Sequence, residues 1–114
     1  MPRREYTLSG YRGMWLFAMF DLPVGTKAER KRYAKFRKML VEDGFSMLQF
    51  SVYARYCVDE ESALAHRRQV RSAIPPEGYV RLLSITDRQF GKMENFVGKK
   101  PVPAQKAPQQ LSLF

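Results

Sequence analysis

The stretch MWLFAMFDLPVGTKAERKRYAKFRKML, residues 14–40, joins an apolar run to a basic amphipathic segment, and this junction decides the fold. The run at 15–20 is continuously apolar, which is typical of a strand covered on both faces. After the turn DLPVG, the sequence TKAE at 26–29 matches a helix capping box. The junction therefore predicts a strand, a turn and a helix over about residues 27–43.

Three further segments complete the pattern downstream. FSML at 45–48 and SVYARYCV at 51–58 are typical of short strands that pair as a hairpin. DEESALAHRRQVRSAI at 59–74 opens with an acidic turn and ends before two prolines, which predicts a second helix. YVRLLSIT at 79–86 predicts a fourth strand. The order βαββαβ indicates an α+β, ferredoxin-like sandwich, in which two helices cover one face of a four-stranded antiparallel sheet.

The other face of this sheet has no expected cover within the chain, so we expect a homodimer packed through it. We assign residues 1–98 to one ferredoxin-like domain, with 1–13 as an N-terminal lead. DRQFGKMENFVG at 87–98 predicts a short helical turn and an extra C-terminal strand. Residues 99–114 contain three prolines and predict a flexible linker that ends in apolar LSLF. LSLF at 111–114 either has no role or docks as a strand on another chain.

The charge balance points to a polyanionic partner. The chain has 20 Lys+Arg against 11 Asp+Glu, a formal net charge of +9 over 114 residues, and such an excess favours nucleic acid. No apolar run reaches the ~18 residues of a membrane span, and the first residues lack the apolar centre of a signal peptide. We therefore expect a soluble, cytoplasmic protein that has no membrane partner.

Positive charge is concentrated on the two predicted helices. Residues 27–43 carry seven Lys+Arg against three acidic residues, which favours phosphate contact at least as strongly as mere solubility. Arg55, Arg81 and Arg88 add positive charge elsewhere, and GFSMLQFSVYARY at 44–56 interleaves aromatic and polar residues in a pattern that fits either base stacking or a strand core. The residues predicted to contact nucleic acid are Lys27, Arg30, Lys31, Lys35, Arg37, Lys38, Arg67, Arg68 and Arg71.

Asp21 ends the first strand on the face that carries Trp15, Phe17 and Met19. One interpretation is a turn residue that accepts hydrogen bonds from following amides. The other is a metal ligand, but one carboxylate is too few for Mg²⁺, which takes octahedral oxygen ligands. A two-fold dimer would duplicate Asp21 near its axis, and two carboxylates with a bound Mg²⁺ could activate a water for attack on a phosphodiester.

The single Cys57 excludes an intramolecular disulfide, and together with the single His66 it excludes the usual Cys/His zinc clusters. Cys57 lies in a strand-like run and is expected to be a small buried residue. His66 lies in a charged helical stretch, where we expect a solvated or phosphate-touching side chain.

Four segments resemble the Cas2 family of small CRISPR-associated adaptation proteins: MFDLP at 19–23, ERKRYAKFRKML at 29–40, GFSMLQFSVYARY at 44–56 and VRLLSIT at 80–86. The sequences of these segments are most similar to those of family members found beside type II CRISPR systems. The resemblance implies a ferredoxin-like homodimer and a magnesium-dependent endoribonuclease, with Asp21 as catalytic residue and metal ligand. It also implies a role in spacer acquisition, in which the dimer bridges two copies of the larger integrase subunit on foreign double-stranded DNA.

Three functions therefore stand beside one another. The first is a dimeric scaffold for duplex DNA, and the second is a metal-dependent phosphodiesterase that cuts RNA or DNA at Asp21. The third is a monomeric RNA-binding module, because the same βαββαβ order serves domains that stack single-stranded RNA on an open sheet face. The basic-glycine-aromatic signature of those domains is absent from VRLLSIT and SVYARY.

Overall fold

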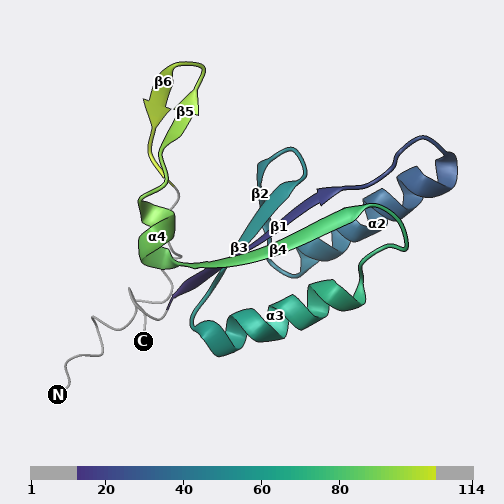
Figure 1. Ribbon diagram of the computed structural model, residues 1–114, viewed down its shortest axis with the longest axis horizontal. Helices are drawn as coiled ribbons and strands as arrows, with labels where there is room; N and C mark the ends of the chain where they lie inside the picture. The colour runs from purple at the N-terminus through teal and green to yellow at the C-terminus, as the bar shows by residue number, and fades with distance from the viewer. Residues whose placement is uncertain (1–12, 105–114) are drawn as a thin grey trace.

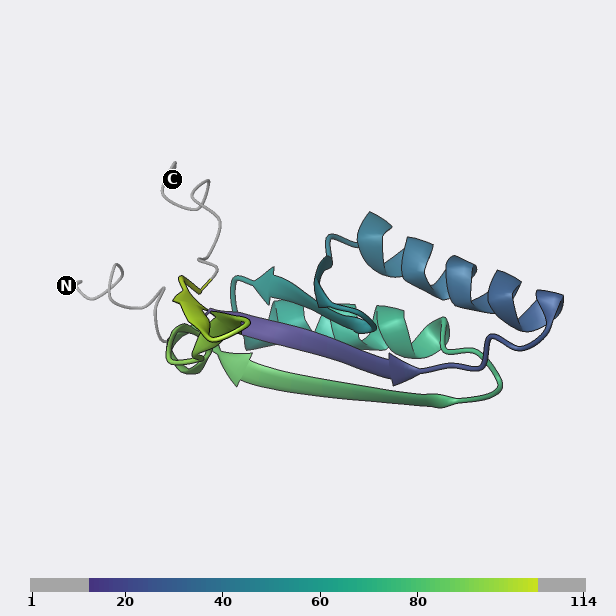
Figure 2. The same ribbon diagram turned by 90° about the horizontal axis from the view of Figure 1, so that it is seen from above.

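The computed structural model describes residues 13–104, and its four-stranded sheet has the antiparallel order β2-β3-β1-β4. Helices α2 and α3 lie on one side of this sheet (Figures 1 and 2). This is the predicted ferredoxin-like α+β fold. The elements are β1 Met14–Asp21, α2 Lys27–Glu42, β2 Ser46–Gln49, β3 Val52–Cys57, α3 Glu60–Ser72, β4 Tyr79–Thr86, α4 Asp87–Gly91, β5 Asn95–Val97 and β6 Lys100–Val102.

The helix-covered face of the sheet holds the larger core cluster. Leu16 and Phe20 of central strand β1 pack there with Phe36 and Leu40 of α2. Phe20 meets Phe36 edge to face at 5.1 Å between ring centroids. Two helices thus bury one side of β1, and β1 also pairs with β3 and β4 along its two edges.

The predicted capping box at the start of α2 is confirmed. Glu29 N donates to Thr26 Oγ1 at 3.1 Å, and Thr26 N donates to Glu29 Oε1 at 2.9 Å. At the other end, Gly44 has φ +92°, a left-handed conformation that glycine adopts without strain. The helix therefore begins at the expected residue and ends one residue before the expected Asp43.

The prediction that the other sheet face has no cover is wrong at one end. Helix α4 places Phe90 against Trp15, with parallel rings 4.0 Å apart between centroids. Trp15 Nε1 also donates to Asp87 Oδ1 at 2.7 Å. The reason is local: Thr86 and Gln89 form a second capping box that starts α4 directly after β4 and folds it back over β1. The opposite end of this face, at Asp21, stays exposed.

The C-terminal part of the described chain forms a separate hairpin. Strand β5 confirms the predicted extra strand, and it pairs with β6 rather than with the main sheet. Strand β6 lies in the segment assigned to the linker, so the predicted boundary at 99 cuts through this hairpin, which projects from the sandwich (Figure 1). The predicted docking segment 111–114 and residues 1–12 lie outside the described residues.

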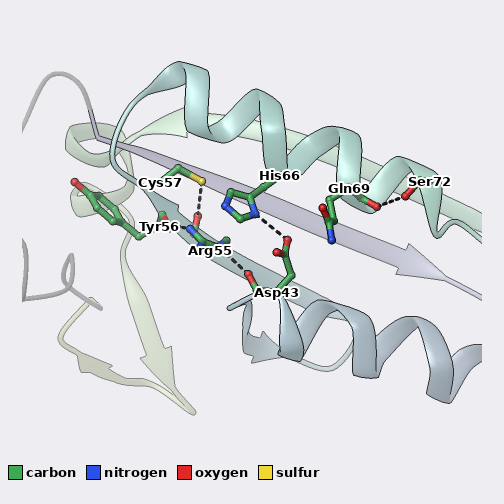
Figure 3. Close-up of polar contacts among 7 residues, drawn as sticks. All are labelled: Asp43, Arg55, Tyr56, Cys57, His66, Gln69 and Ser72. Atoms are coloured by element: carbon green, nitrogen blue, oxygen red, sulfur yellow. Dashed lines mark hydrogen bonds and ion pairs between the residues drawn. The ribbon is translucent and has the colours of Figure 1, made fainter.

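Polar contacts hold α3 to the end of α2 (Figure 3). His66 Nδ1 lies 2.9 Å from Asp43 Oδ2, and Arg55 Nε donates to the Asp43 carbonyl at 2.7 Å. The half-buried His66 is therefore a structural residue, and the expectation of a solvated or phosphate-touching side chain is wrong. Cys57 is buried as predicted, and burial raises the pKa of its thiol. No helix within residues 13–104 is long and apolar enough to cross a membrane.

Candidate nucleic-acid interface and metal site

Asp21 lies exposed at the carboxyl end of β1, on the face that α4 leaves open. It is opposite Tyr79, the first residue of β4, in the antiparallel register. A shallow pocket of about 390 Å³ surrounds the strand end and is lined by Met19, Phe20, Asp21, Tyr79 and Arg81. The pocket is large enough for a phosphate or hydrated ion, and Asp21 is its one carboxylate.

Two residues of β4 beside Asp21 were not predicted as site residues. The sequence indicated Arg81 only as additional positive charge, and it did not single out Tyr79. Arg81 is opposite Met19 in the β1–β4 register, and its Cζ lies 5.4 Å from the centroid of the Tyr79 ring. Such a cation-π contact orients the guanidinium beside the Asp21 pocket. The signal was present in the sequence as alternation, because residues 79 and 81 share one face of a strand, but placing them beside Asp21 required the strand pairing.

Gly78 fixes the backbone at Asp21. It has φ +98°, and a Cβ there would lie 2.7 Å from the Asp21 carbonyl oxygen and 2.8 Å from Leu22 Cδ2. Neither atom can move easily, since one is backbone and the other belongs to a buried side chain. The loop before β4 therefore presses directly on the strand end that carries the carboxylate.

A metal site is incomplete in one chain. Within residues 13–104 no group of three or more His, Cys, Asp or Glu residues is placed to hold an ion. Mg²⁺ is typically held by one or two carboxylates together with waters and substrate phosphates. Asp21 is exposed and accessible for that chemistry, so the donor set fits Mg²⁺ only if a second chain or a bound phosphate supplies the remaining oxygens.

The basic residues predicted on α2 are all exposed. Arg32, which was not among them, is half-buried and pairs with Glu77 at 3.7 Å. Arg30 Nη1 donates to the carbonyls of Val24 and Gly25 at 3.2 and 3.3 Å, which orients its side chain along the loop before the helix. No lysine of α2 has a carboxylate within ion-pair distance among the residues that the structure describes. The exposed set on α2 is Lys27, Arg30, Lys31, Lys35, Arg37 and Lys38.

The three arginines predicted to contact nucleic acid from α3 differ in their exposure to solvent. Arg68 and Arg71 are exposed. Arg67 is half-buried, and its Nη2 donates to Ser84 Oγ of β4, so this guanidinium joins α3 to the sheet. A role of Arg67 in phosphate contact stays a prediction, and its packing gives it a structural role as well.

The structure brings the end of β1 close to the ends of α2 and α3, but it places Asp21 on the other side of the sheet from the basic face of α2. The end of β1, the first turn of α2 and the C-terminal end of α3 lie at the same end of the sheet (Figure 1). A small pocket between α2 and the loops that follow β1 and α3 is lined by Leu22, Glu29, Pro75 and Glu77, among others. Asp21 nevertheless faces away from the helix layer, so the carboxylate and the basic face of α2 lie on opposite sides of the sheet.

The chain is thus a small, basic α+β domain with a ferredoxin-like sheet, a basic helix layer and an exposed aspartate at the end of a strand. The family model described as CRISPR associated protein Cas2 matches residues 14–93, and the chain belongs to this family. A Flavobacterium psychrophilum relative named CRISPR-associated endoribonuclease Cas2 is 50% identical over 115 residues, covering 100% of both chains. One of the same name from Parvibaculum lavamentivorans is 52% identical over 101 residues, covering 89% of this chain and 100% of the relative.

Proposed function

We propose that the chain acts in spacer acquisition as a two-fold dimer that binds foreign duplex DNA and bridges two copies of the larger integrase subunit. The observation that carries the proposal is the exposed basic face of α2, whose four lysines have no carboxylate partner among residues 13–104. An arrangement of this kind binds phosphates and releases counterions without reading sequence. The family membership of the chain supports the adaptation role.

The dimer in this proposal forms through the part of the sheet face that α4 leaves open. Tyr79, opposite Asp21 in the register, is 69% exposed there, and Leu83, farther along the same face of β4 and opposite Phe17, is 47% exposed. A second copy would cover these apolar side chains and would bring its own Asp21 to the same place. A single partner chain would thus both cover the exposed apolar area and supply the second carboxylate.

The test is the salt dependence of duplex binding. We expect log K to fall linearly with log salt, with a slope of about −0.9 per phosphate contact. Replacing Lys31 and Lys35 together by Gln should reduce the magnitude of the slope by about 2 and weaken binding to all duplex sequences. Arg32→Gln is the control on the same helix, because Arg32 already pairs with Glu77. Equal binding by the double variant and the control would contradict the proposal.

We also propose a second activity, magnesium-dependent cleavage of single-stranded RNA. The relatives are named endoribonucleases, which supports cleavage of RNA. Two Asp21 carboxylates of a dimer would hold the ion, and Arg81 would contact a phosphate beside it. A bound Mg²⁺ would supply Lewis-acid stabilisation of charge on the phosphate and a more acidic water. Cleavage should require Mg²⁺, stop with chelator and disappear in Asp21→Asn, whereas Glu42→Gln, an exposed carboxylate on α2, should retain it. Activity that survives Asp21→Asn belongs to another site or to a contaminant.

The mass in solution separates these dimeric functions from a monomeric RNA-binding module. Both proposals require twice the mass of the 13.3 kDa chain. A monomer that binds single-stranded RNA through the open sheet face would overturn the dimer and favour the module instead.

A further inference from the structure

Phe50 is the most exposed large apolar side chain of the described residues, at 80%. It lies in the turn between β2 and β3, with polar neighbours Gln49 and Ser51. Scattered exposed apolar residues are ordinary in proteins. Phe50 differs from these because its ring contacts a second aromatic side chain on α2, and two arginines lie on the same stripe of that helix.

The ring of Phe50 lies nearly parallel to that of Tyr33 of α2 and offset from it, with centroids 6.3 Å apart and planes inclined by 21°. Tyr33 is fixed in turn, since its hydroxyl lies 3.2 Å from Ser51 Oγ and its ring packs against Phe20. Ser51 has φ +63°, an unusual conformation for a residue with a side chain, and its carbonyl accepts from Phe20 N at 3.1 Å. The Phe50 ring is therefore bordered on one side by a fixed aromatic residue, and it is otherwise largely open to solvent.

Positive charge lies on either side of this aromatic pair. Arg30 precedes Tyr33 by three residues and Arg37 follows it by four, so all three share one stripe of α2. Both arginines are exposed. Arg30 uses Nη1 for the carbonyls of Val24 and Gly25, which leaves Nε and Nη2 for a ligand. Arg37 has no carboxylate within ion-pair distance in the described part of the chain.

We propose that Phe50 is a stacking platform for an unpaired base of a nucleic acid strand, with Arg30 and Arg37 contacting the phosphates on either side. An aromatic face bordered by cations is the arrangement that binds single strands without sequence preference. A protein partner would also cover an apolar ring, but it would have to bring carboxylates for both arginines, whereas a nucleic acid strand carries its charges at every step. The inference rests on the proposed nucleic-acid-binding function and adds to it a site for unpaired bases.

The experiment compares wild type, Phe50→Ala, Phe50→Trp and Phe96→Ala on two probes, a single-stranded oligonucleotide with 2-aminopurine at its centre and a plain DNA duplex. Phe96, in β5, is the matched control, as it is also an exposed phenylalanine at 57%. Phe50→Ala should bind the single strand ~5- to 150-fold more weakly and lose the fluorescence quenching of a stacked base. Phe50→Trp should restore both, and duplex affinity should stay unchanged in every variant.

Single-strand affinity and quenching that are the same in Phe50→Ala as in wild type would overturn the platform and leave the duplex scaffold intact. Wild-type protein that binds neither probe would overturn both. If Phe50→Ala keeps its single-strand affinity but halves the mass in solution, Phe50 is a contact between copies of the chain, and the platform is again overturned.

Discussion

The two ends of the open sheet face differ although the same strands build them. At one end, Trp15 and Phe17 of β1 are 5% and 8% exposed and pack against Phe90. At the other end, Met19 and Asp21 continue the same alternation on β1, and Asp21 is exposed beside Tyr79. A five-residue helix, α4, makes the difference, because it covers the first end and does not reach the second.

Alternation along a strand therefore assigns a residue to a face but does not say whether that face is buried. The covered end has become a small second core with a charge-bearing hydrogen bond between Trp15 and Asp87. The uncovered end keeps a carboxylate and a guanidinium accessible to solvent and ligands. Substitutions of buried side chains at the covered end should change stability, and substitutions of exposed side chains at the uncovered end should change binding and chemistry.

Removing the cover should have the largest effect. Phe90→Ala deletes the ring that stacks on Trp15, and we expect the free energy of unfolding to fall by about 3–5 kcal/mol, as for other buried aromatic side chains. Denaturant unfolding measures the change. Phe96→Ala, on the exposed hairpin, should lie within about 0.5 kcal/mol of wild type. Equal losses in the two variants would mean that α4 does not cover the sheet.

A side chain at Gly78 tests how tightly the uncovered end is held. Gly78→Ala should lower the free energy of unfolding by about 1–3 kcal/mol, since a Cβ collides with the Asp21 backbone at an unfavourable φ. It should also reduce cleavage by displacing Asp21. Gly91→Ala is the control, because a Cβ there meets nothing within 4 Å. A Gly78→Ala variant as stable as wild type would contradict the close contact.

The two aspartates of the face should separate stability from chemistry. Asp87→Asn weakens the bond to Trp15 Nε1, and a loss of about 1 kcal/mol in unfolding free energy is expected. Asp21→Asn should change unfolding by less than about 0.5 kcal/mol, because that side chain is exposed. Thermal or denaturant unfolding of both variants gives the comparison. The reverse order would indicate that Asp21 has a structural role.

The smallest effect concerns alkaline pH at the covered end. Burial, followed by the negative charges of Asp87 and of the Cys57 thiolate, raises the pKa of Tyr56 above its ordinary value of 10.0. The neutral phenol is thus favoured in the folded chain, and this contribution is fully present below pH 10 and is lost as pH rises through the folded pKa. Unfolding free energy measured against pH should fall less steeply above pH 10 in Tyr56→Phe than in wild type. Superimposable curves would exclude this contribution.

The sequence predicted the fold well because its signals are local. The capping box at Thr26, the continuous apolar run of β1 and the apolar, β-branched composition of β4 each depend on a few neighbouring residues. It also identified Asp21 and the basic face of α2 as candidates. The partners of these residues were beyond its reach: the pairing of Asp21 with Tyr79 depends on the register between β1 and β4, which are far apart in the chain.

The same limit explains the errors. His66 bonds Asp43 across 23 positions, so a helical pattern alone shows it as a surface residue. The bond of Arg67 to Ser84, across 17 positions, was likewise beyond a helical pattern, although it does not test the predicted phosphate contact. Helix α4 was expected as a short turn, but its position over Trp15 follows from where β4 ends in space. Local patterns specify elements, whereas contacts between distant segments decide which polar side chains stay free for a ligand.

Thr86 belongs to two elements at once, as the last residue of β4 and the N-cap of α4. A slip of β4 by one residue along β1 would turn its side chains to the opposite face and carry Phe90 away from Trp15 in the same step. A change of register would therefore also break the packing of Phe90 on Trp15, and only one register of β4 against β1 preserves both. Over evolutionary time, insertions should be rejected between Tyr79 and Phe90 and tolerated beyond Met93, where the hairpin begins.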